Sequence, residues 1–169
     1  MTRVLLASGL LFLLLSPTPS DAVSMTNDPK GFGNISWGSP LASRTDLEVF
    51  RETPHVIEYQ LKGQPPTYAD VPVETLRLSS IDNQFARVTI RYKQEGTHKK
   101  ILAFLEREFG PLEHIPGQMV RGLNQQYTWR GSETEINLTY HANTERGYIF
   151  IDSRTLAPRF NDFITDSAE

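Results

Sequence analysis

Residues 86–92 alternate strictly between apolar and polar side chains, and this pattern restricts the fold of the chain more than any other. The apolar positions are Ala86, Val88, Ile90 and Tyr92, and the polar positions are Arg87, Thr89 and Arg91. Because successive side chains of a β-strand point to opposite faces, the pattern predicts a strand with one buried face and one wet face. Such strands are typical of antiparallel sheets that are covered on one face only.

Further segments share this two-residue period. Their apolar positions are Ile57, Tyr59 and Leu61; Leu76 and Leu78; Tyr127 and Trp129; and Ile136, Leu138 and Tyr140. In the last segment, either Tyr148 and Phe150 or Ile149 and Ile151 can form the apolar face. Turn-forming residues separate the segments. The segments after residue 125 therefore predict a meander of three strands.

Two segments carry helix signals. Residues 97–109 form the stronger one, with Thr97 as the expected N-cap and with Gly110 and Pro111 as the stop. Its apolar stripe consists of Ile101, Leu102, Phe104, Leu105 and Phe109. Ser39 and Pro40 predict a second, short helix that ends before Thr45.

Together these elements predict the α+β class. We expect an antiparallel sheet of about five to six strands, with one long helix packed across it and a short N-terminal helix. The residues expected to share one core are Val88, Ile90, Ile101, Leu105, Phe109, Trp129, Ile136 and Leu138.

The first residues have the features of a secretory signal peptide. Arg3 is followed by the apolar residues 4–15 and by a polar, proline-containing exit at 16–20. The apolar stretch is shorter than the roughly 20 residues that span a bilayer. Small residues predict cleavage before Val23 or before Met25. An uncleaved membrane anchor is the competing interpretation.

The predicted organisation is a signal peptide at 1–22, a flexible leader at 23–30, one α+β domain at 31–160 and a frayed tail at 161–169. We therefore expect an exported protein, periplasmic or extracellular, with no membrane span in the mature chain. The sequence gives no indication of the oligomeric state.

The chain contains no cysteine, which excludes disulfides, thiolate catalysis and lipid attachment at a lipobox cysteine. Its formal net charge is −3 and its isoelectric point is about 5.8, with scattered lysines and arginines. This balance gives no electrostatic basis for binding nucleic acid, so no such partner is expected.

Residues suited to catalysis or metal binding are few. The side chains that ordinarily titrate near neutral pH are His55, His98, His114 and His141, and no two share a metal-ligand spacing. Glu106 and Glu108 point in different directions around the predicted helix. Paired acids from distant segments, such as Asp82 with Glu133, stay open. No catalytic residue, cofactor or metal ligand is predicted.

Aromatic residues allow two interpretations. They could line a groove for a carbohydrate or a peptide, or they could pack in the core, which alternation along successive strands favours. The residues concerned are Trp37, Trp129, Tyr127, Tyr140 and Tyr148.

Phe32, Ile35, Trp37 and Gly38 form the N-terminal motif of the domain, a candidate structural or interaction motif. We expect Trp37 to be buried against the sheet, because Gly38 turns the chain directly after it. With the later residues Phe109, Gly110, Tyr127, Trp129, Gly131 and Ser153, the chain resembles a group of uncharacterised exported bacterial proteins that share a Phe-x-Gly-Ile-x-Trp-Gly motif. Asn34 departs from the glycine of that group, and asparagine tolerates positive φ. The resemblance implies export and a shared fold, without a mechanism.

Two functions follow as hypotheses. The first is a non-catalytic binding or assembly module of the cell envelope, which would hold a protein partner at a sheet edge or an aromatic groove. The second is a small periplasmic hydrolase or ligand-processing enzyme whose site is built from dispersed His, Asp and Glu residues.

Overall fold

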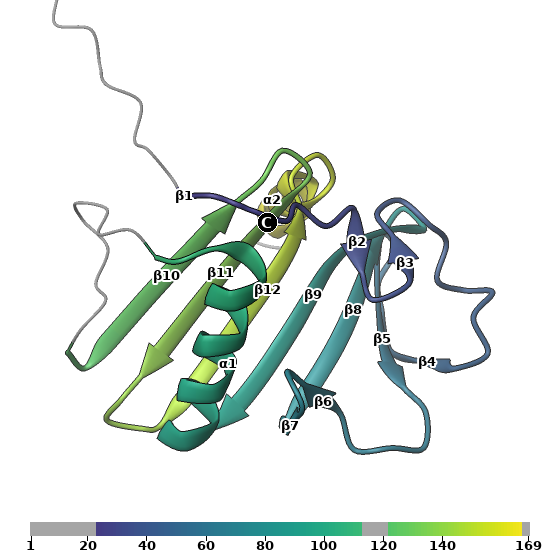
Figure 1. Ribbon diagram of the computed structural model, residues 1–169. Coiled ribbons are helices and arrows are strands. Elements are labelled where there is room, and N and C mark those ends of the chain that lie inside the picture. Colours follow the sequence, from purple (N-terminus) through teal and green to yellow (C-terminus); the bar gives the residue numbers. More distant parts are fainter. Residues whose placement is uncertain (1–22, 113–121, 167–169) are drawn as a thin grey trace, which may run out of the picture.

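The structure is a computed structural model that describes residues 23–112 and 122–166. Its main sheet has the strand order β1-β10-β11-β12-β9-β8-β5-β4 (Figure 1). The strands of this sheet are β1 (Val23–Ser24), β4 (Leu47–Glu52), β5 (Val56–Leu61), β8 (Thr75–Ile81), β9 (Gln84–Lys93), β10 (Asn124–Arg130), β11 (Thr134–His141) and β12 (Arg146–Ser153). Seven of them are antiparallel, and β1 is added in parallel at the edge of β10.

Smaller elements surround this sheet. They are the hairpin of β2 (Gly31–Phe32) and β3 (Ile35–Ser36), the hairpin of β6 (Thr67–Tyr68) and β7 (Val71–Pro72), the helices α1 (Glu95–Phe109) and α2 (Phe160–Asp166), and a 3-10 turn at Ala157–Arg159. No helix in the described part of the chain is long and apolar enough to cross a membrane.

The predicted α+β class with one long helix packed across the sheet is wrong, because the protein is mostly β. The helices have only 15 and 7 residues. Seven strands spaced about 4.8 Å apart span roughly 29 Å, whereas a helix is about 10 Å wide. The helix α1 therefore covers only part of the sheet, on the side of β9 to β12, and the two small hairpins lie over the remaining strands (Figure 1).

The predicted strands are present, and the meander after residue 122 is confirmed. Of the two possible apolar faces of β12, the one with Ile149 and Ile151 is buried, and Phe150 on the other face is 36% exposed. The sequence analysis missed β4, an edge strand whose pattern is irregular because its pairing with β5 shifts between Val49 and Arg51.

The helix α1 starts two residues before the predicted N-cap. Gln94 precedes it with φ 76° and no side-chain cap, so Thr97 does not cap the helix. The predicted stop is confirmed, since the helix ends at Phe109 and the Gly110 amide donates to the Glu106 carbonyl. Gly110 has φ 104° and ψ 158°, which is a glycine conformation outside the left-handed helical region.

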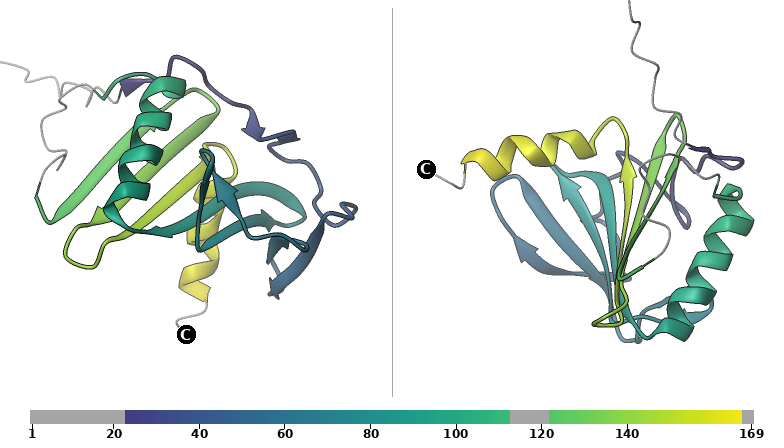
Figure 2. Two further views of the ribbon diagram at one scale, coloured as in Figure 1. Left: turned by 60° about the horizontal axis from the view of Figure 1, so that its bottom comes forward. Right: turned by 90° about the vertical axis from the view of Figure 1, so that its left-hand side faces the viewer.

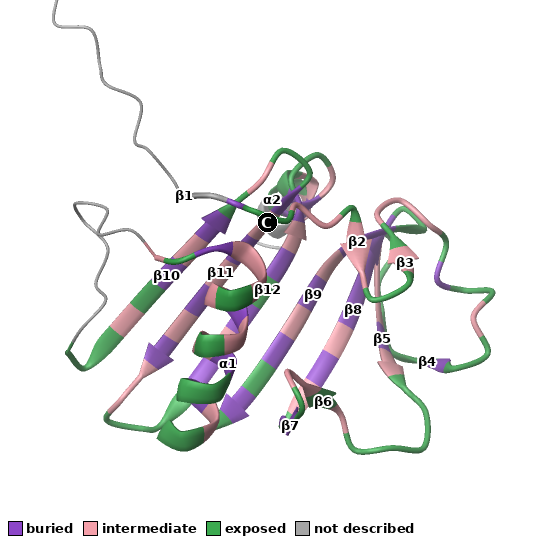
Figure 3. Ribbon diagram, in the orientation of Figure 1, coloured by how far each residue is buried: buried purple, intermediate pink, exposed green. Residues whose placement is uncertain are grey.

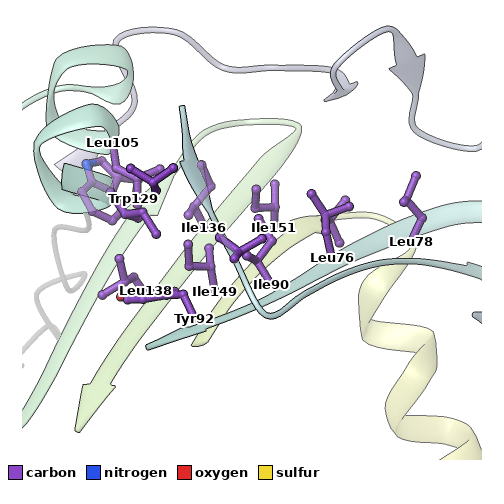
Figure 4. Close-up of a cluster of buried hydrophobic side chains, with 14 of the residues drawn as sticks. Leu76, Leu78, Ile90, Tyr92, Leu105, Trp129, Ile136, Leu138, Ile149 and Ile151 are labelled. Carbon is purple, nitrogen blue, oxygen red and sulfur yellow. The ribbon is translucent and has the colours of Figure 1, made fainter. Parts of the chain in front are cut away.

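The predicted core is confirmed. Seven of its eight members are at most 1% exposed, and Figure 4 shows Leu105 of α1 beside Trp129 of the sheet. The eighth, Phe109, packs against the core partly buried. Trp129 is completely buried, and its indole N–H donates to the Gly110 carbonyl at 3.0 Å. The end of α1 is thereby tied to the sheet.

The segment 23–30, predicted as a leader, makes contacts with the sheet. The strand β1 pairs with Trp129 and Arg130, and Met25 is 8% exposed. The Asp28 carboxylate accepts hydrogen bonds from the amides of Ser132, Glu133 and Thr134. Gly131 makes room for this contact, because a Cβ there would lie 2.2 Å from the Asp28 carboxylate.

Two other local predictions are corrected. Residues 39–46 form turns without a helix, and the amide of Ser39 donates to the Ser36 carbonyl in one of them. Of the tail predicted to fray at 161–169, residues 161–166 belong to α2, and residues 167–169 lie outside the described residues. A small second core gives α2 its anchor: Phe160 and Ala157 pack against Ile81 and Ala86. The predicted signal peptide at 1–22 lies outside the described residues.

Candidate functional site

The two helices lie on opposite faces of the main sheet (Figure 2). One face carries the core, under α1 and the hairpins. The other carries the polar positions of the strands, and α2 covers one end of it. We call its uncovered part the open face and define it by Phe50, Arg77, Thr89, Arg91, Tyr148 and Phe150. All six are exposed or half-buried (Figure 3).

Strand register arranges the open face in rows. Arg91 of β9 lies opposite Tyr148 of β12. In the next row, Thr89 lies between Phe150 of β12 and Arg77 of β8. Aromatic rings and guanidinium groups from three strands therefore become neighbours.

Arg91 is exposed and stacks on a ring. Its guanidinium carbon lies 5.7 Å from the centre of the Tyr148 ring. Within residues 23–112 and 122–166, no carboxylate forms an ion pair with Arg91. A guanidinium stacked on a ring keeps its N–H edges available, and these edges match the two oxygens of a carboxylate. Arg91 is thus suited to bind an anion.

Arg77 adds a second positive charge to the open face. Its guanidinium carbon lies 3.3 Å from the centre of the Phe50 ring, and it donates to Gln60. Burial lowers the pKa of Arg77, Glu58 raises it, and the like charge of Arg91 lowers it. The two guanidinium groups are therefore close enough to repel each other, and an anion bound between them would relieve this repulsion.

The end of the same face under α2 is already closed. Arg87 forms a two-pronged ion pair with Asp152, with distances of 2.7 and 3.0 Å, and its guanidinium lies 4.7 Å from the centre of the Phe160 ring. Burial raises the pKa of Asp152 although Arg87 lowers it. Arg87 thus has a carboxylate partner and the cover of α2, whereas Arg91 has neither within the described residues.

The N-terminal motif packs within the chain. The Trp37 indole donates to Thr134 at 2.8 Å and lies 4.7 Å from the Phe85 ring, while Gly38, with φ 79°, donates its amide to the Phe85 carbonyl. Phe32 stacks on Tyr68, and Ile35 packs against the core. Trp37 is half-buried, less than the expected full burial.

The described histidines lie apart. His55 pairs with Asp82 and stacks on Phe163 at the α2 end, and His141 contacts Asn124 and the edge of Tyr148. The residue His114 lies outside the described residues.

His98 is buried in the core, 3% exposed, under α1. The Tyr92 hydroxyl lies 2.8 Å from its Nδ1, and Gln125 Oε1 lies 3.3 Å from its Nε2. Burial lowers the pKa of His98, although the Gln125 hydrogen bond raises it. The imidazole is therefore neutral near pH 7, and both of its nitrogens are in use.

The acidic pairs considered from sequence do not form a site. The Asp82 side chain binds His55 and Arg159. Glu133 lies elsewhere, where its backbone amide donates to the Asp28 carboxylate. Glu108 pairs with its neighbour Arg107. No group of three or more His, Cys, Asp or Glu side chains suited to a metal ion occurs within the described ranges.

The aromatic residues divide between the two faces. Trp129, Tyr127 and Tyr140 are at most 5% exposed on the core face, which agrees with the core interpretation, whereas Tyr148 lies on the open face. The sequence analysis missed Phe50 and Phe150. Their position could not be read from local pattern, because only the register of β12 and the bulge of β4 bring them to this face.

Comparison of the chain with known protein families, with curated proteins and with solved structures finds no match.

Proposed function

We propose that this protein is an exported, non-catalytic binding module of the cell envelope, and that its open face holds an acidic segment of a partner protein. The observation that carries this proposal is Arg91, an exposed guanidinium over the Tyr148 ring that has no carboxylate partner among the described residues. Arg87, on the same face of the same strand, has such a partner in Asp152.

The charge of the surrounding surface supports an anionic partner. The chain as a whole has a net charge of −3, so a positive cluster stands against its average. In the row beyond Arg91, Arg146 lies opposite Lys93, is exposed, and forms no ion pair within the described part of the chain. Cations on adjacent strands can contact successive acidic side chains of one extended segment.

The aromatic neighbours favour a protein segment over a free anion. Phe50 is 49% exposed and Phe150 is 36% exposed, beside the guanidinium groups. Interfaces are enriched in arginine and aromatic residues, because both bury a large planar area at low entropic cost. A partner that contributes apolar side chains between its acids would cover these rings.

The enzymatic alternative has less support. His98 is the histidine with a buried, organised environment, and both of its nitrogens already hold hydrogen bonds. A general base needs a nitrogen within reach of a substrate proton. The exposed His55 is paired with Asp82 beside α2, away from the cations of the open face.

The proposal is tested with a fluorescein-labelled peptide of alternating Glu and Tyr residues and a matched peptide with Gln in place of Glu. We expect the Glu peptide alone to bind, more weakly at higher salt because exposed charges are screened. Arg91→Gln should weaken binding about tenfold, the loss of one charge-assisted hydrogen-bond pair.

Arg107→Gln is the matched control, because Arg107 is an exposed arginine 5.2 Å from the Phe104 ring on the other side of the molecule. Equal binding of both peptides would overturn the proposal, as would equal losses in the two variants. Preferential binding to vesicles that contain phosphatidylglycerol, with no peptide binding, would replace the protein partner by a membrane.

Export is tested separately by N-terminal sequencing of the protein from a secreting host. Cleavage before Val23 leaves β1 whole, whereas cleavage before Met25 removes its pairing with Trp129 and Arg130. We therefore expect Val23 as the mature N-terminus. An intact Met1 would contradict export by cleavage.

A further inference from the structure

A second site lies on the other face of the sheet, beside the first two turns of α1. A cavity of about 240 Å³ opens between this helix and the turn from β11 to β12. Its lining includes Glu95, Lys99 and Leu102 from the helix and Tyr140, Ala142 and Glu145 from the sheet side. The helix residues are spaced by three or four, so the cavity runs along the side of α1.

The floor of the cavity is built from stacked rings. The His98 and Tyr140 rings lie 3.9 Å apart at an interplanar angle of 4°. Tyr92 continues the stack, 6.5 Å from Tyr140. Gly147 makes room for it, because a Cβ there would lie 1.9 Å from the Tyr92 ring. The floor is thus rigid.

Three tyrosine hydroxyls lie near the cavity floor, those of Tyr92, Tyr127 and Tyr140, and two of them hydrogen-bond to described residues. The Tyr92 hydroxyl bonds His98, and the Tyr127 hydroxyl donates to Gln125 at 2.8 Å. Tyr140 is 2% exposed, yet its hydroxyl makes no hydrogen bond with any residue that the structure describes. The Tyr140 ring is buried but its side chain lines the cavity, so the hydroxyl is free to accept a hydrogen bond from a ligand there.

The Tyr140 hydroxyl faces the charged rim of the cavity. Burial raises the pKa of Tyr140, Glu145 and Glu95 raise it further, and Lys99 lowers it. Such interactions require these charges to be near the hydroxyl. The side chain is therefore aimed at the rim residues.

The charges of the rim select a cation. Glu95 and Lys99 neutralise each other in an ion pair of 2.7 Å. Glu145 forms no ion pair in the described ranges, so it leaves the rim with an excess of one negative charge. Leu102 and Ala142 supply an apolar wall beside this charge.

We propose that this cavity binds a small ligand that carries a primary ammonium group on a short apolar chain. The ammonium donates to the Tyr140 hydroxyl oxygen and to the Glu145 carboxylate, and the carbon chain lies against Leu102 and Ala142. This site is separate from the open face and does not depend on the function proposed for it.

The test is an NMR titration of the folded protein with propylammonium chloride, compared with 1-propanol and sodium propionate at the same concentrations. We expect saturable shifts at Leu102, Ala142 and Glu145 for propylammonium in the millimolar range. The alcohol and the carboxylate should bind at least tenfold more weakly, because they lack the positive charge.

Two variants locate the ligand. Tyr140→Phe keeps the stacked ring and removes only the hydroxyl, and Glu145→Gln removes only the charge. Each should weaken propylammonium binding about tenfold, while Glu133→Gln, an exposed acid at the opposite end of the sheet, should not change it. Equal binding of 1-propanol, or unchanged binding in Tyr140→Phe with an unchanged NMR spectrum elsewhere, would overturn the proposal.

Discussion

The two faces of strand β9 have the same backbone and opposite environments. Val88 and Ile90 are completely buried on the core face, whereas Arg91 is exposed on the open face. The core face is closed by α1 and by two hairpins, and the other face is closed only where α2 reaches (Figure 2). The comparison teaches that the two faces of one strand can differ completely in burial, so that the residues that stabilise the fold and those of the candidate open-face site lie back to back.

On the face of β9 opposite the core, Arg87 and Arg91 sharpen the same contrast. They are four residues apart and point the same way, yet Arg87 has both the Asp152 carboxylate from β12 and the Phe160 ring from α2. Arg91 has neither contact among the residues that the structure describes. The candidate site is therefore the part of this face that the described residues leave uncovered.

The largest effect is expected from emptying the core face. Trp129→Ala should lower the free energy of unfolding by about 3 to 5 kcal/mol, because the indole is fully buried and its N–H bonds the Gly110 carbonyl. Urea denaturation measures this. A loss below about 1 kcal/mol would show that α1 contributes little to the core.

The next largest effect concerns the space for Tyr92. Gly147→Ala should lower the free energy of unfolding by about 1 to 3 kcal/mol, because the added methyl group would overlap the Tyr92 ring. Gly96→Ala is the control, because neither Gly147 nor Gly96 has a positive φ and no atom lies within 4 Å of a Cβ at Gly96. Equal losses in the two variants would contradict the overlap with Tyr92.

A smaller effect is expected from pH, through His98. Its folded pKa is lowered by burial, so below about pH 6.5 the unfolded chain binds the proton and the folded chain does not. The free energy of unfolding should therefore fall as the pH is lowered from 7.5 to 5, by up to about 1.4 kcal/mol per pH unit.

Variants isolate this contribution from the carboxylates. His98→Gln should reduce the slope of stability against pH, and His141→Gln, at a histidine without an ion pair in the described ranges, is the control. Urea denaturation at several pH values measures both. A slope unchanged by His98→Gln would mean that this imidazole is protonated in the folded protein.

The smallest effect is expected on the open face. Arg91→Gln should change the free energy of unfolding by less than about 0.5 kcal/mol, since the side chain is exposed and has no ion pair in the described part of the chain. Thermal and urea denaturation measure it. A loss above 1 kcal/mol would break the comparison, because Arg91 would then be structural like Arg87.

Local sequence pattern determined a large part of this protein. The alternation of residues 86–92 fixed which side chains of β9 are wet, and Gly110 with Pro111 fixed the end of α1. Seven of the eight core residues expected from periodicity are completely or almost completely buried. These properties follow from repeats of two or 3.6 residues, which a short segment carries by itself.

Only the tertiary structure decided the fold class and the candidate sites. The sequence pattern of a 15-residue helix carries no information on the width of the sheet. It therefore could not indicate that α1 covers only part of the sheet. The Asp28 contacts with residues 132–134 join positions more than 100 residues apart, so no local pattern could indicate that this polar segment packs against the sheet.

Both candidate sites depend on contacts between residues that are far apart in the sequence. Arg91 meets Tyr148 through the register of β9 with β12, and Tyr140 meets Glu95 and Glu145 where a helix, a strand and a turn converge. The sequence by itself determined which residues could be buried or wet, because that depends on neighbours along the chain. Which wet residue lacks a partner depends on the charges brought near it in space, and only the folded chain sets these.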